Sequence, residues 1–345
     1  MSEASHPRPP GPEPFLRGAR QPPHPDAPYP RADPGPLGER LPRDTWAAAC
    51  IPAGVRFEWE GDARSVEIEY ETRSDDLGYR GDGAGRCFTL FQGDRLVHEA
   101  AALLGRSSLR VECDGSDAAR RILYLPEGMK PCVLSLRAEG GSMHPPGPQP
   151  SWLCYGDSIA EGWSASGPAH SWPAVAARRV GLDLVNMAYA GAARGEIVSA
   201  EQLAALPADL ISLSHGTNCW SRIPHSEGMF REGLRAFLEI LRAGQPRTPI
   251  IAVSPLLRPD AEDTRNALGA TLADLRRVFE DVVLERRAAG DEALTLLEGQ
   301  KLVGAAQLAD EVHPDDAGHR AVAEAVAPLL ASALRGPGSE SPSQP

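Results

Sequence analysis

The chain has 345 residues, of which 42% are hydrophobic and 24% are charged, and its formal net charge is −12. These proportions are ordinary for a globular protein, and the acidic balance argues against a nucleic-acid partner, which would need a basic surface. Because one domain typically has about 100 to 200 residues, we expect two domains and terminal tails.

Residues 1–36 are crowded with Pro, Gly, Arg and Asp and show neither a helical nor a strand period. This composition predicts a disordered, Pro-rich arm. The first residues also lack a basic segment followed by an apolar one, so we expect no secretory signal and a cytoplasmic protein. No apolar run approaches the roughly 20 residues that span a bilayer, so no membrane partner is expected.

The six cysteines are widely scattered and show no zinc-type spacing. We therefore predict free thiols, and neither a metal nor a cofactor. Most of them fall in apolar runs that resemble strands, where a free cysteine behaves as a small buried hydrophobe.

Residues 37–139 contain short apolar runs separated by turn residues. In Val66-Glu-Ile-Glu-Tyr70 apolar and charged residues alternate, which is typical of a strand with one buried face. We predict an all-β sandwich or jelly-roll domain. Its expected strands are 54–59, 65–72, 87–92, 95–100, 108–113, 121–125 and 132–137.

Residues 140–150 are rich in Gly and Pro and predict a linker. Beyond them, residues 151–335 alternate short apolar runs with longer amphipathic stretches such as 271–289 and 319–334, which predicts a three-layer α/β/α domain with a parallel, flavodoxin-like sheet. The expected strands are 151–155, 183–187, 209–214, 249–253 and 293–297. Residues 336–345 predict a disordered tail.

The first strand of this α/β domain runs into Gly156-Asp-Ser158. A glycine permits a tight turn, which would leave Ser158 at a helix start with an exposed hydroxyl and a free backbone N–H. Both a nucleophile and an oxyanion donor are useful at such a position. The structural alternative is that Ser158 only caps the helix.

Near the end of the domain, Asp310 and His313 lie three residues apart, followed by Pro314. A serine nucleophile needs an imidazole to take its proton and a carboxylate to orient that imidazole. One loop could supply both groups. The structural alternative is an acidic helix start with His313 on the surface.

Four short blocks in order resemble the GDSL (SGNH) hydrolase family over roughly residues 150–335. They are Gly156-Asp-Ser158, Asn186-Met-Ala-Tyr-Ala-Gly191, Gly216-Thr-Asn218 and Asp310-x-x-His313-Pro314. The β-rich segment before them resembles the N-terminal jelly roll of some carbohydrate esterases in this family. The family often has Asp after the Asn of the third block, where this chain has Cys219, so local support of Asn218 is expected to differ.

The resemblance implies a triad of Ser158, His313 and Asp310. It also implies an oxyanion hole formed by the backbone N–H groups of Ser158 and Gly191 and by the Asn218 side chain. The chemistry of the residues agrees, because glycine lets a backbone N–H approach a substrate closely and an amide is a neutral donor.

Aromatic and basic residues near these blocks are candidate substrate contacts, with core packing as the alternative for each. They are Trp163, Trp172, Tyr189, Arg194 and Trp220. The other histidines near the blocks lack the carboxylate partner that His313 has, and we expect them on the surface or in supporting positions. They are His170, His215, His225 and His319.

The sequence thus predicts an enzyme that cleaves the acyl ester of a small molecule or carbohydrate through an acyl-enzyme on Ser158. Two alternatives stay open: an acyltransferase that uses the same acyl-enzyme, and a non-catalytic protein that binds a carbohydrate or other ligand on the same fold. The complete set of predicted site residues argues against the second alternative, but nothing in the sequence separates hydrolysis from transfer.

Overall fold

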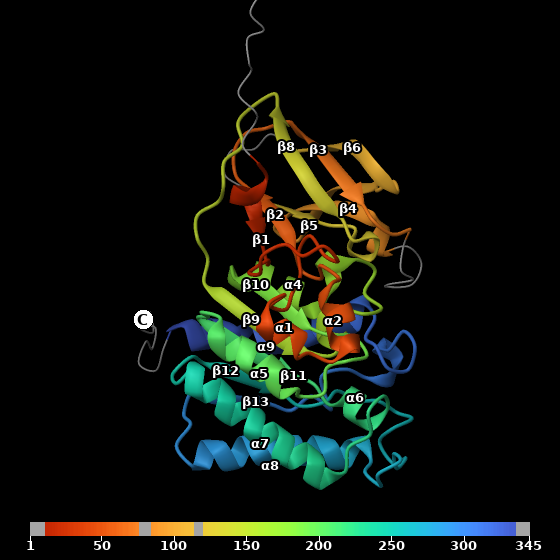
Figure 1. Cartoon of the computed structure of the whole chain (residues 1–345), viewed down its shortest axis with the longest axis vertical. Helices are drawn as coiled ribbons and strands as arrows, with labels where there is room; N and C mark the ends of the chain where they lie inside the picture. Colours follow the sequence, from red (N-terminus) through yellow and green to blue (C-terminus); the bar gives the residue numbers. More distant parts are fainter. Residues whose placement is uncertain (1–10, 76–83, 114–119, 336–345) are drawn as a thin grey trace, which may run out of the picture. The chain divides into compact units, whose positions relative to one another are not determined.

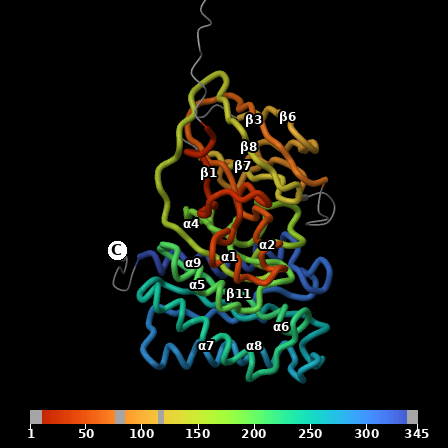
Figure 2. The backbone as a smooth tube through the Cα atoms, viewed as in Figure 1, coloured from red at the N-terminus to blue at the C-terminus, as the bar shows by residue number. Residues whose placement is uncertain are grey.

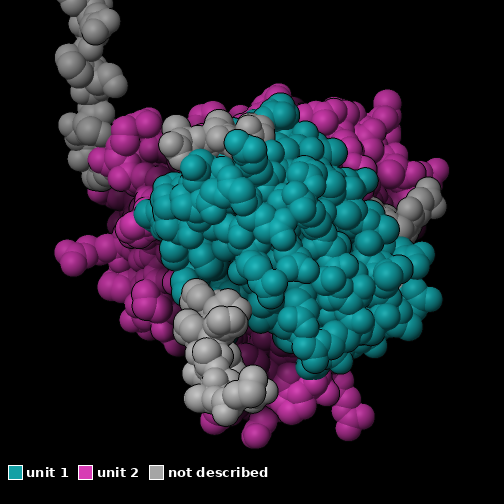
Figure 3. Space-filling model, turned by 90° about the horizontal axis from the view of Figure 1, so that it is seen from above, with its two compact units in different colours: residues 1–17, 55–147 teal, residues 18–54, 148–345 magenta. Residues whose placement is uncertain are grey.

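A computed structural model of the chain describes residues 11–75, 84–113 and 120–335. The chain divides into two compact units, which Figure 3 shows in different colours. Unit 1 consists of residues 1–17 and 55–147, and unit 2 consists of residues 18–54 and 148–345. The backbone can be followed by colour in Figure 2 from unit 1 into unit 2, back into unit 1 and again into unit 2.

Unit 1 contains two antiparallel sheets, which confirms the predicted β domain. Their strand orders are β1-β2-β7-β4-β5 and β6-β3-β8. In β3 the side chains of Val66, Ile68 and Tyr70 are buried while the intervening glutamates are more exposed, as the alternating sequence predicts. The elements are η1 (Glu13–Phe15), β1 (Leu16–Arg17), β2 (Arg56–Trp59), β3 (Ser65–Thr72), η2 (Ala84–Arg86), β4 (Cys87–Gln92), β5 (Arg95–Ala101), β6 (Gly105–Glu112), β7 (Arg121–Tyr124), η3 (Glu127–Met129) and β8 (Cys132–Glu139).

Unit 2 contains a parallel five-stranded sheet with the order β10-β9-β11-β12-β13. This is the flavodoxin-like order, in which the chain changes direction across the sheet between the first and third strands and places a ligand site beyond their carboxyl ends. The predicted parallel sheet is therefore confirmed. Its strands are β9 (Ser151–Gly156), β10 (Asp183–Ala188), β11 (Leu210–Ser214), β12 (Ile250–Val253) and β13 (Leu294–Leu297).

Helices cover both faces of this sheet. Leu153 and Tyr155 of β9 belong to one apolar cluster, whereas Trp152 and Cys154 belong to the other, because successive side chains of a strand point to opposite faces. Helices α5, α7 and α8 pack into the first cluster, and α4 and α9 pack into the second (Figure 1). No helix among the described residues is long and apolar enough to cross a bilayer.

The helices of unit 2 include short turns at the carboxyl ends of the strands and long amphipathic segments between them. They are α1 (Pro36–Glu39), α2 (Arg43–Ala49), α3 (Ser158–Glu161), η4 (Pro168–His170), α4 (Trp172–Val180), α5 (Ile197–Ala205), α6 (Thr217–Trp220), α7 (Glu227–Gly244), α8 (Leu272–Ala288), η5 (Ala305–Gln307) and α9 (Asp316–Arg335).

The N-terminal segment differs from its prediction. The described residues 11–36 are ordered: β1 pairs with β2, and Arg31 is 2% exposed within unit 2. Residues 37–54 also belong to unit 2 and not to the β domain. Composition misled the prediction because a Pro-rich segment can be fixed by a few buried side chains. The predicted linker begins too early, since residues up to 147 belong to unit 1, and residues 1–10 and 336–345 lie outside the described residues.

Candidate active site

Ser158 lies at the start of α3, directly beyond β9. Gly156 is required there, because a Cβ atom at this position would lie 2.5 Å from the Ser214 carbonyl oxygen. Asp157 is the residue that caps the helix, since its side chain accepts a hydrogen bond from the Ile159 N–H. The alternative that Ser158 serves as the cap is therefore wrong. Ser158 is 6% exposed and lines a pocket.

The capping carboxyl of Asp157 sits in an unusual environment. Burial raises the pKa of Asp157 to about 6, although hydrogen bonds from the backbone of Ile159, Thr217 and Gly216 act in the opposite direction. These bonds join the turn after β9 to the turn after β11. Asp157 thus fixes the turn that carries Ser158.

His313 connects Ser158 to Asp310. The Ser158 hydroxyl lies 2.8 Å from His313 Nε2, and His313 Nδ1 lies 2.7 Å from Asp310 Oδ2. The other Asp310 oxygen accepts hydrogen bonds from the backbone N–H groups of Val312 and His313. Glu311, which lies between Asp310 and Val312, has a φ of 67°, a strained conformation for a residue other than glycine. The three predicted triad residues thus come together.

The electrostatics of the pair suit proton transfer. Burial lowers the pKa of His313, while the hydrogen bond and charge of Asp310 raise it and the charge of Arg258 lowers it further. Burial pushes the pKa of Asp310 upward, but its hydrogen bonds from His313 outweigh burial and the pKa lies below the usual value. A neutral imidazole beside an ionised carboxylate can take the proton of a serine hydroxyl.

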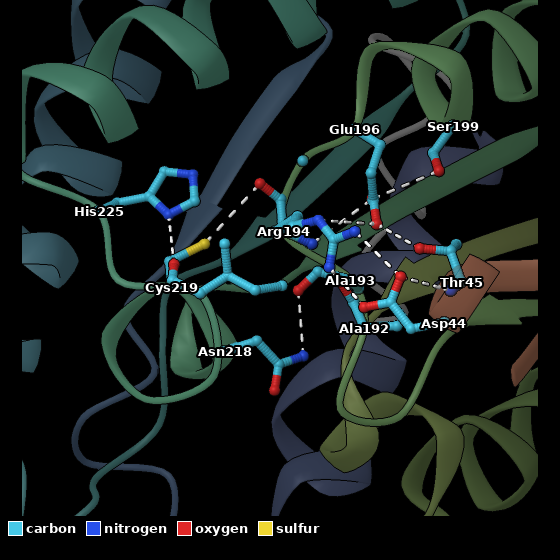
Figure 4. A network of polar contacts seen from close by, with 12 residues as sticks. Asp44, Thr45, Ala192, Ala193, Arg194, Glu196, Ser199, Asn218, Cys219 and His225 are labelled. Atoms are coloured by element: carbon cyan, nitrogen blue, oxygen red, sulfur yellow. Dashed lines mark hydrogen bonds and ion pairs between the residues drawn. The ribbon is translucent and has the colours of Figure 1, made fainter. Parts of the chain in front are cut away.

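The predicted oxyanion residues lie beside Ser158 in the same pocket. Gly191 follows β10 with a φ of 66°, and Asn218 belongs to α6 beyond β11. The Asn218 amide donates a hydrogen bond of 3.0 Å to the Ala193 carbonyl oxygen, which fixes its orientation (Figure 4). One N–H of this amide remains for a ligand, because the group has two.

The pocket has a volume of about 410 Å³. Besides Ser158, His313, Gly191 and Asn218, it is lined by Trp163 and by two arginines, Arg222 and Arg258. In the described parts of the chain, no group of three or more His, Cys, Asp or Glu side chains could hold a metal ion. The polar groups that line the pocket include the Ser158 hydroxyl, the His313 imidazole and the Asn218 amide.

The predicted substrate contacts divide into two groups. Trp163 lines the pocket, and its carbonyl oxygen accepts a hydrogen bond of 3.2 Å from His319 Nε2. Tyr189 and Trp172 are fully buried in the core. Arg194 forms an ion pair with Asp44 and contacts Glu196, as Figure 4 shows, and Trp220 stacks against Arg258. None of these four residues lines the pocket. The expectation of direct substrate contact is therefore corrected for Tyr189, Arg194 and Trp220, whose side chains are occupied within the protein.

Two other predictions concerned residues around the site. Of the histidines predicted on the surface or in supporting positions, His215 and His319 are buried: each is at most 2% exposed. Burial lowers the pKa of His215 to about 4. Cys219 is fully buried, its sulfur lies 3.7 Å from the Arg194 carbonyl oxygen, and burial raises its pKa well above the usual value. All six cysteines are free thiols.

Sequence reasoning missed a buried ion pair beside the site. Arg31 Nη2 lies 2.7 Å from a Glu161 oxygen, and the same oxygen accepts a hydrogen bond of 3.0 Å from the Ala190 N–H. Both charged side chains are 0% exposed. Ala190 precedes Gly191, so this pair supports the loop after β10 that carries the predicted oxyanion residue Gly191. Arg31 lies in a Pro-rich segment with no helical or strand period, so no sequence pattern indicates that it forms a buried ion pair.

Comparison with protein families agrees with this geometry. Residues 154–321 match the GDSL-like Lipase/Acylhydrolase family. The matched segment begins in β9 and ends in α9, so it includes Ser158, Asp310 and His313. The chain thus carries a GDSL-like lipase/acylhydrolase domain, which confirms the family resemblance. No protein with a curated description matches the chain in sequence.

Several solved structures are similar over both units. A salicylyl-acyltransferase, SsfX3, from a tetracycline biosynthetic pathway is 26% identical, with a TM-score of 0.78, and the match covers 92% of this chain and 94% of that one. A protein from Bacteroides ovatus that carries the description GDSL-like lipase is 18% identical, with a TM-score of 0.78 over 94% and 97% of the two chains. A family two carbohydrate esterase from Clostridium thermocellum is 14% identical, with a TM-score of 0.60 over 81% and 91%. The last two show a shared fold.

Proposed function

We propose that this protein cleaves acyl esters through a covalent acyl-enzyme on Ser158. The observation that carries the proposal is the contact chain from Ser158 Oγ to His313 Nε2, 2.8 Å, and from His313 Nδ1 to Asp310, 2.7 Å. A serine hydroxyl in hydrogen-bond contact with an imidazole that a carboxylate orients is an activated nucleophile.

The reaction proceeds in two halves. His313 takes the proton of Ser158 as the oxygen attacks the ester carbonyl, and the resulting oxyanion is bound by Asn218 and by the N–H groups of Ser158 and Gly191. His313 then gives that proton to the departing alcohol, which leaves an acyl group on Ser158. In the second half, His313 takes a proton from water as the water oxygen bonds to the acyl carbon. The bond between this carbon and Ser158 Oγ then breaks, His313 gives the proton to Oγ, and the acid leaves.

Hydrolysis of 4-nitrophenyl esters from acetate to octanoate tests the proposal. We expect turnover by the full-length protein and none above background by Ser158→Ala. Ser166→Ala, which removes a hydroxyl that is bonded to Asp316 instead of a histidine, is the matched control and should retain activity. Equal rates for the wild type and Ser158→Ala would overturn the proposal.

A second candidate is transfer of the acyl group to an alcohol other than water. It is favoured by the similarity, over nearly the whole chain, to a protein described as a salicylyl-acyltransferase. The acyl-enzyme is common to both reactions, so only the acceptor differs. Product analysis by mass spectrometry with added alcohols separates the two: transfer predicts a new ester at millimolar alcohol, whereas hydrolysis predicts only free acid.

A further inference from the structure

Arg222 occupies a distinctive place in the active-site pocket. It follows α6, the short helix that contains Asn218, and it lines the pocket together with Ser158. Its Nη2, Cζ and Nε atoms would lie 3.5, 3.6 and 3.6 Å from a Cβ atom at Gly191. Because these three atoms are almost equally distant from one point, the flat face of the guanidinium covers Gly191. Its N–H donors, which lie in the plane of the group, are therefore directed along the pocket wall.

The charge of Arg222 is uncompensated, in contrast to that of Arg258 in the same pocket. Arg258 lies over the Trp220 ring and forms paired hydrogen bonds of 2.9 and 3.1 Å with Asp260. Arg222 is exposed and has neither an ion pair nor a hydrogen bond within residues 11–75, 84–113 and 120–335. The one carboxylate of the triad, Asp310, is already bonded to His313. The pocket therefore has a surplus of positive charge.

The loop that carries Arg222 is well fixed. Ile223 N–H donates a hydrogen bond of 2.9 Å to the Asn218 carbonyl oxygen, and His225 N–H donates one of 2.8 Å to that of Cys219. The Asn266 side chain bonds the carbonyl oxygens of both Cys219 and His225. The base of the Arg222 side chain is therefore held in place, which reduces the entropy lost when it binds a ligand.

We propose that Arg222 binds a carboxylate of the ester substrate, so that this site selects anionic esters over neutral ones. The inference rests on the proposed ester cleavage at Ser158. A guanidinium presents its N–H donors in a fork that matches a carboxylate. The carboxylate can belong to the acyl part or to the alcohol part of the ester, and the two sources require separate substrates.

Two matched substrate pairs test the proposal. For the alcohol part, 3-acetoxybenzoate is compared with neutral 3-acetoxybenzamide; for the acyl part, the phenyl monoester of adipic acid is compared with its terminal amide. We expect the wild type to favour the carboxylate member of one pair in kcat/KM by about 10- to 100-fold, the range of a charge-assisted hydrogen bond. The preferred pair identifies the source of the carboxylate.

Variants assign the preference to Arg222. Arg222→Gln should remove the preference, measured as the ratio of the two kcat/KM values within a pair, and Arg222→Lys should retain part of it. Arg235→Gln, which removes an exposed arginine outside the pocket, is the control and should leave the preference intact. Equal rates within both pairs, or a preference that Arg222→Gln leaves unchanged, would overturn the inference while the neutral esters still report ester cleavage. Failure of the wild type to cleave any of the four esters would instead overturn the proposed function, and this inference with it.

Discussion

The two sides of Ser158 are held in place by different means. On the side of the base, the Asp310 and His313 side chains are 47% and 16% exposed, and they lie on a loop that includes the strained Glu311. On the side of the oxyanion loop, the Arg31 and Glu161 side chains are both 0% exposed. Solvent reaches one side and is excluded from the other.

This difference affects how each side should respond to change. Arg31 also donates hydrogen bonds to the backbone carbonyl oxygens of Ala48 and Asn186, so it joins the N-terminal segment to the strand before the oxyanion loop. Removal of one buried charge leaves its partner unpaired, which affects folding. A change at Asp310 or His313 should instead alter chemistry and pH dependence and leave the fold intact.

The largest expected effect on activity is that of His313→Ala. We predict a fall in kcat on the order of 10⁵-fold or more, because the nucleophile loses its base. The melting temperature should change little, since the side chain lies at the pocket surface. His98→Ala, at a partly exposed histidine of β5, is the control. A fall of less than about tenfold would show that another group acts as the base.

The largest expected effect on stability is that of Arg31→Met. Breaking a buried ion pair typically costs about 3 to 5 kcal/mol. We therefore predict a loss of that order in the free energy of unfolding, measured with denaturant. The double variant Arg31→Met/Glu161→Gln should recover part of the loss, because it leaves no unpaired charge. A single variant as stable as the wild type would contradict the contrast between the two sides.

Asn218→Ala should act on the chemical step alone. Loss of one oxyanion donor lowers turnover by about 10²- to 10³-fold. We expect kcat to fall by this factor with KM nearly unchanged, since the oxyanion forms only during the reaction. A rise in KM with kcat intact would assign Asn218 to substrate binding instead.

The pH dependence of kcat/KM should depend on His313 and on the charged residues near it. Activity requires neutral His313, so kcat/KM should rise as pH passes upward through the pKa of His313, which lies below its usual value of 6.5. Asp310 raises this pKa, so Asp310→Asn should move the rise to lower pH as well as reduce the maximum. Arg258 lowers it, so Arg258→Gln should move the rise to higher pH. Shifts in the opposite directions would contradict this electrostatic account.

The smallest expected effect is that of an exposed ion pair in the same N-terminal segment. Arg40 and Glu201 lie 2.6 Å apart, with side chains 54% and 30% exposed. Arg40→Met should change the free energy of unfolding by less than about 1 kcal/mol, because solvent screens such a pair. This variant is the matched control for Arg31→Met. Similar losses in the two variants would show that burial does not distinguish them.

The sequence predicted the parts of the fold in which periodicity reflects burial. In β3 and β4 the expected and observed bounds agree, because apolar side chains alternate with exposed ones or form short, bounded runs. The contact between Ser158 and His313 could also be predicted, since each residue follows a recognisable local pattern. These patterns are contained within a few consecutive residues.

The contacts that depend on distant segments could not be predicted. Arg31 and Glu161 are 130 residues apart, and neither belongs to a periodic pattern. Tyr189 and Arg194 were expected to contact substrate because they lie near the oxyanion block, but burial and the partner Asp44 determine their roles. The same limit applies to residues 11–54, whose order arises from packing and not from composition.

The most direct test of an activated Ser158 is the intact mass of the protein after treatment with a fluorophosphonate probe. We predict one adduct on the wild type, none on Ser158→Ala and strongly slowed labelling of His313→Ala. An unlabelled wild type, or an adduct that persists in Ser158→Ala, would contradict the account.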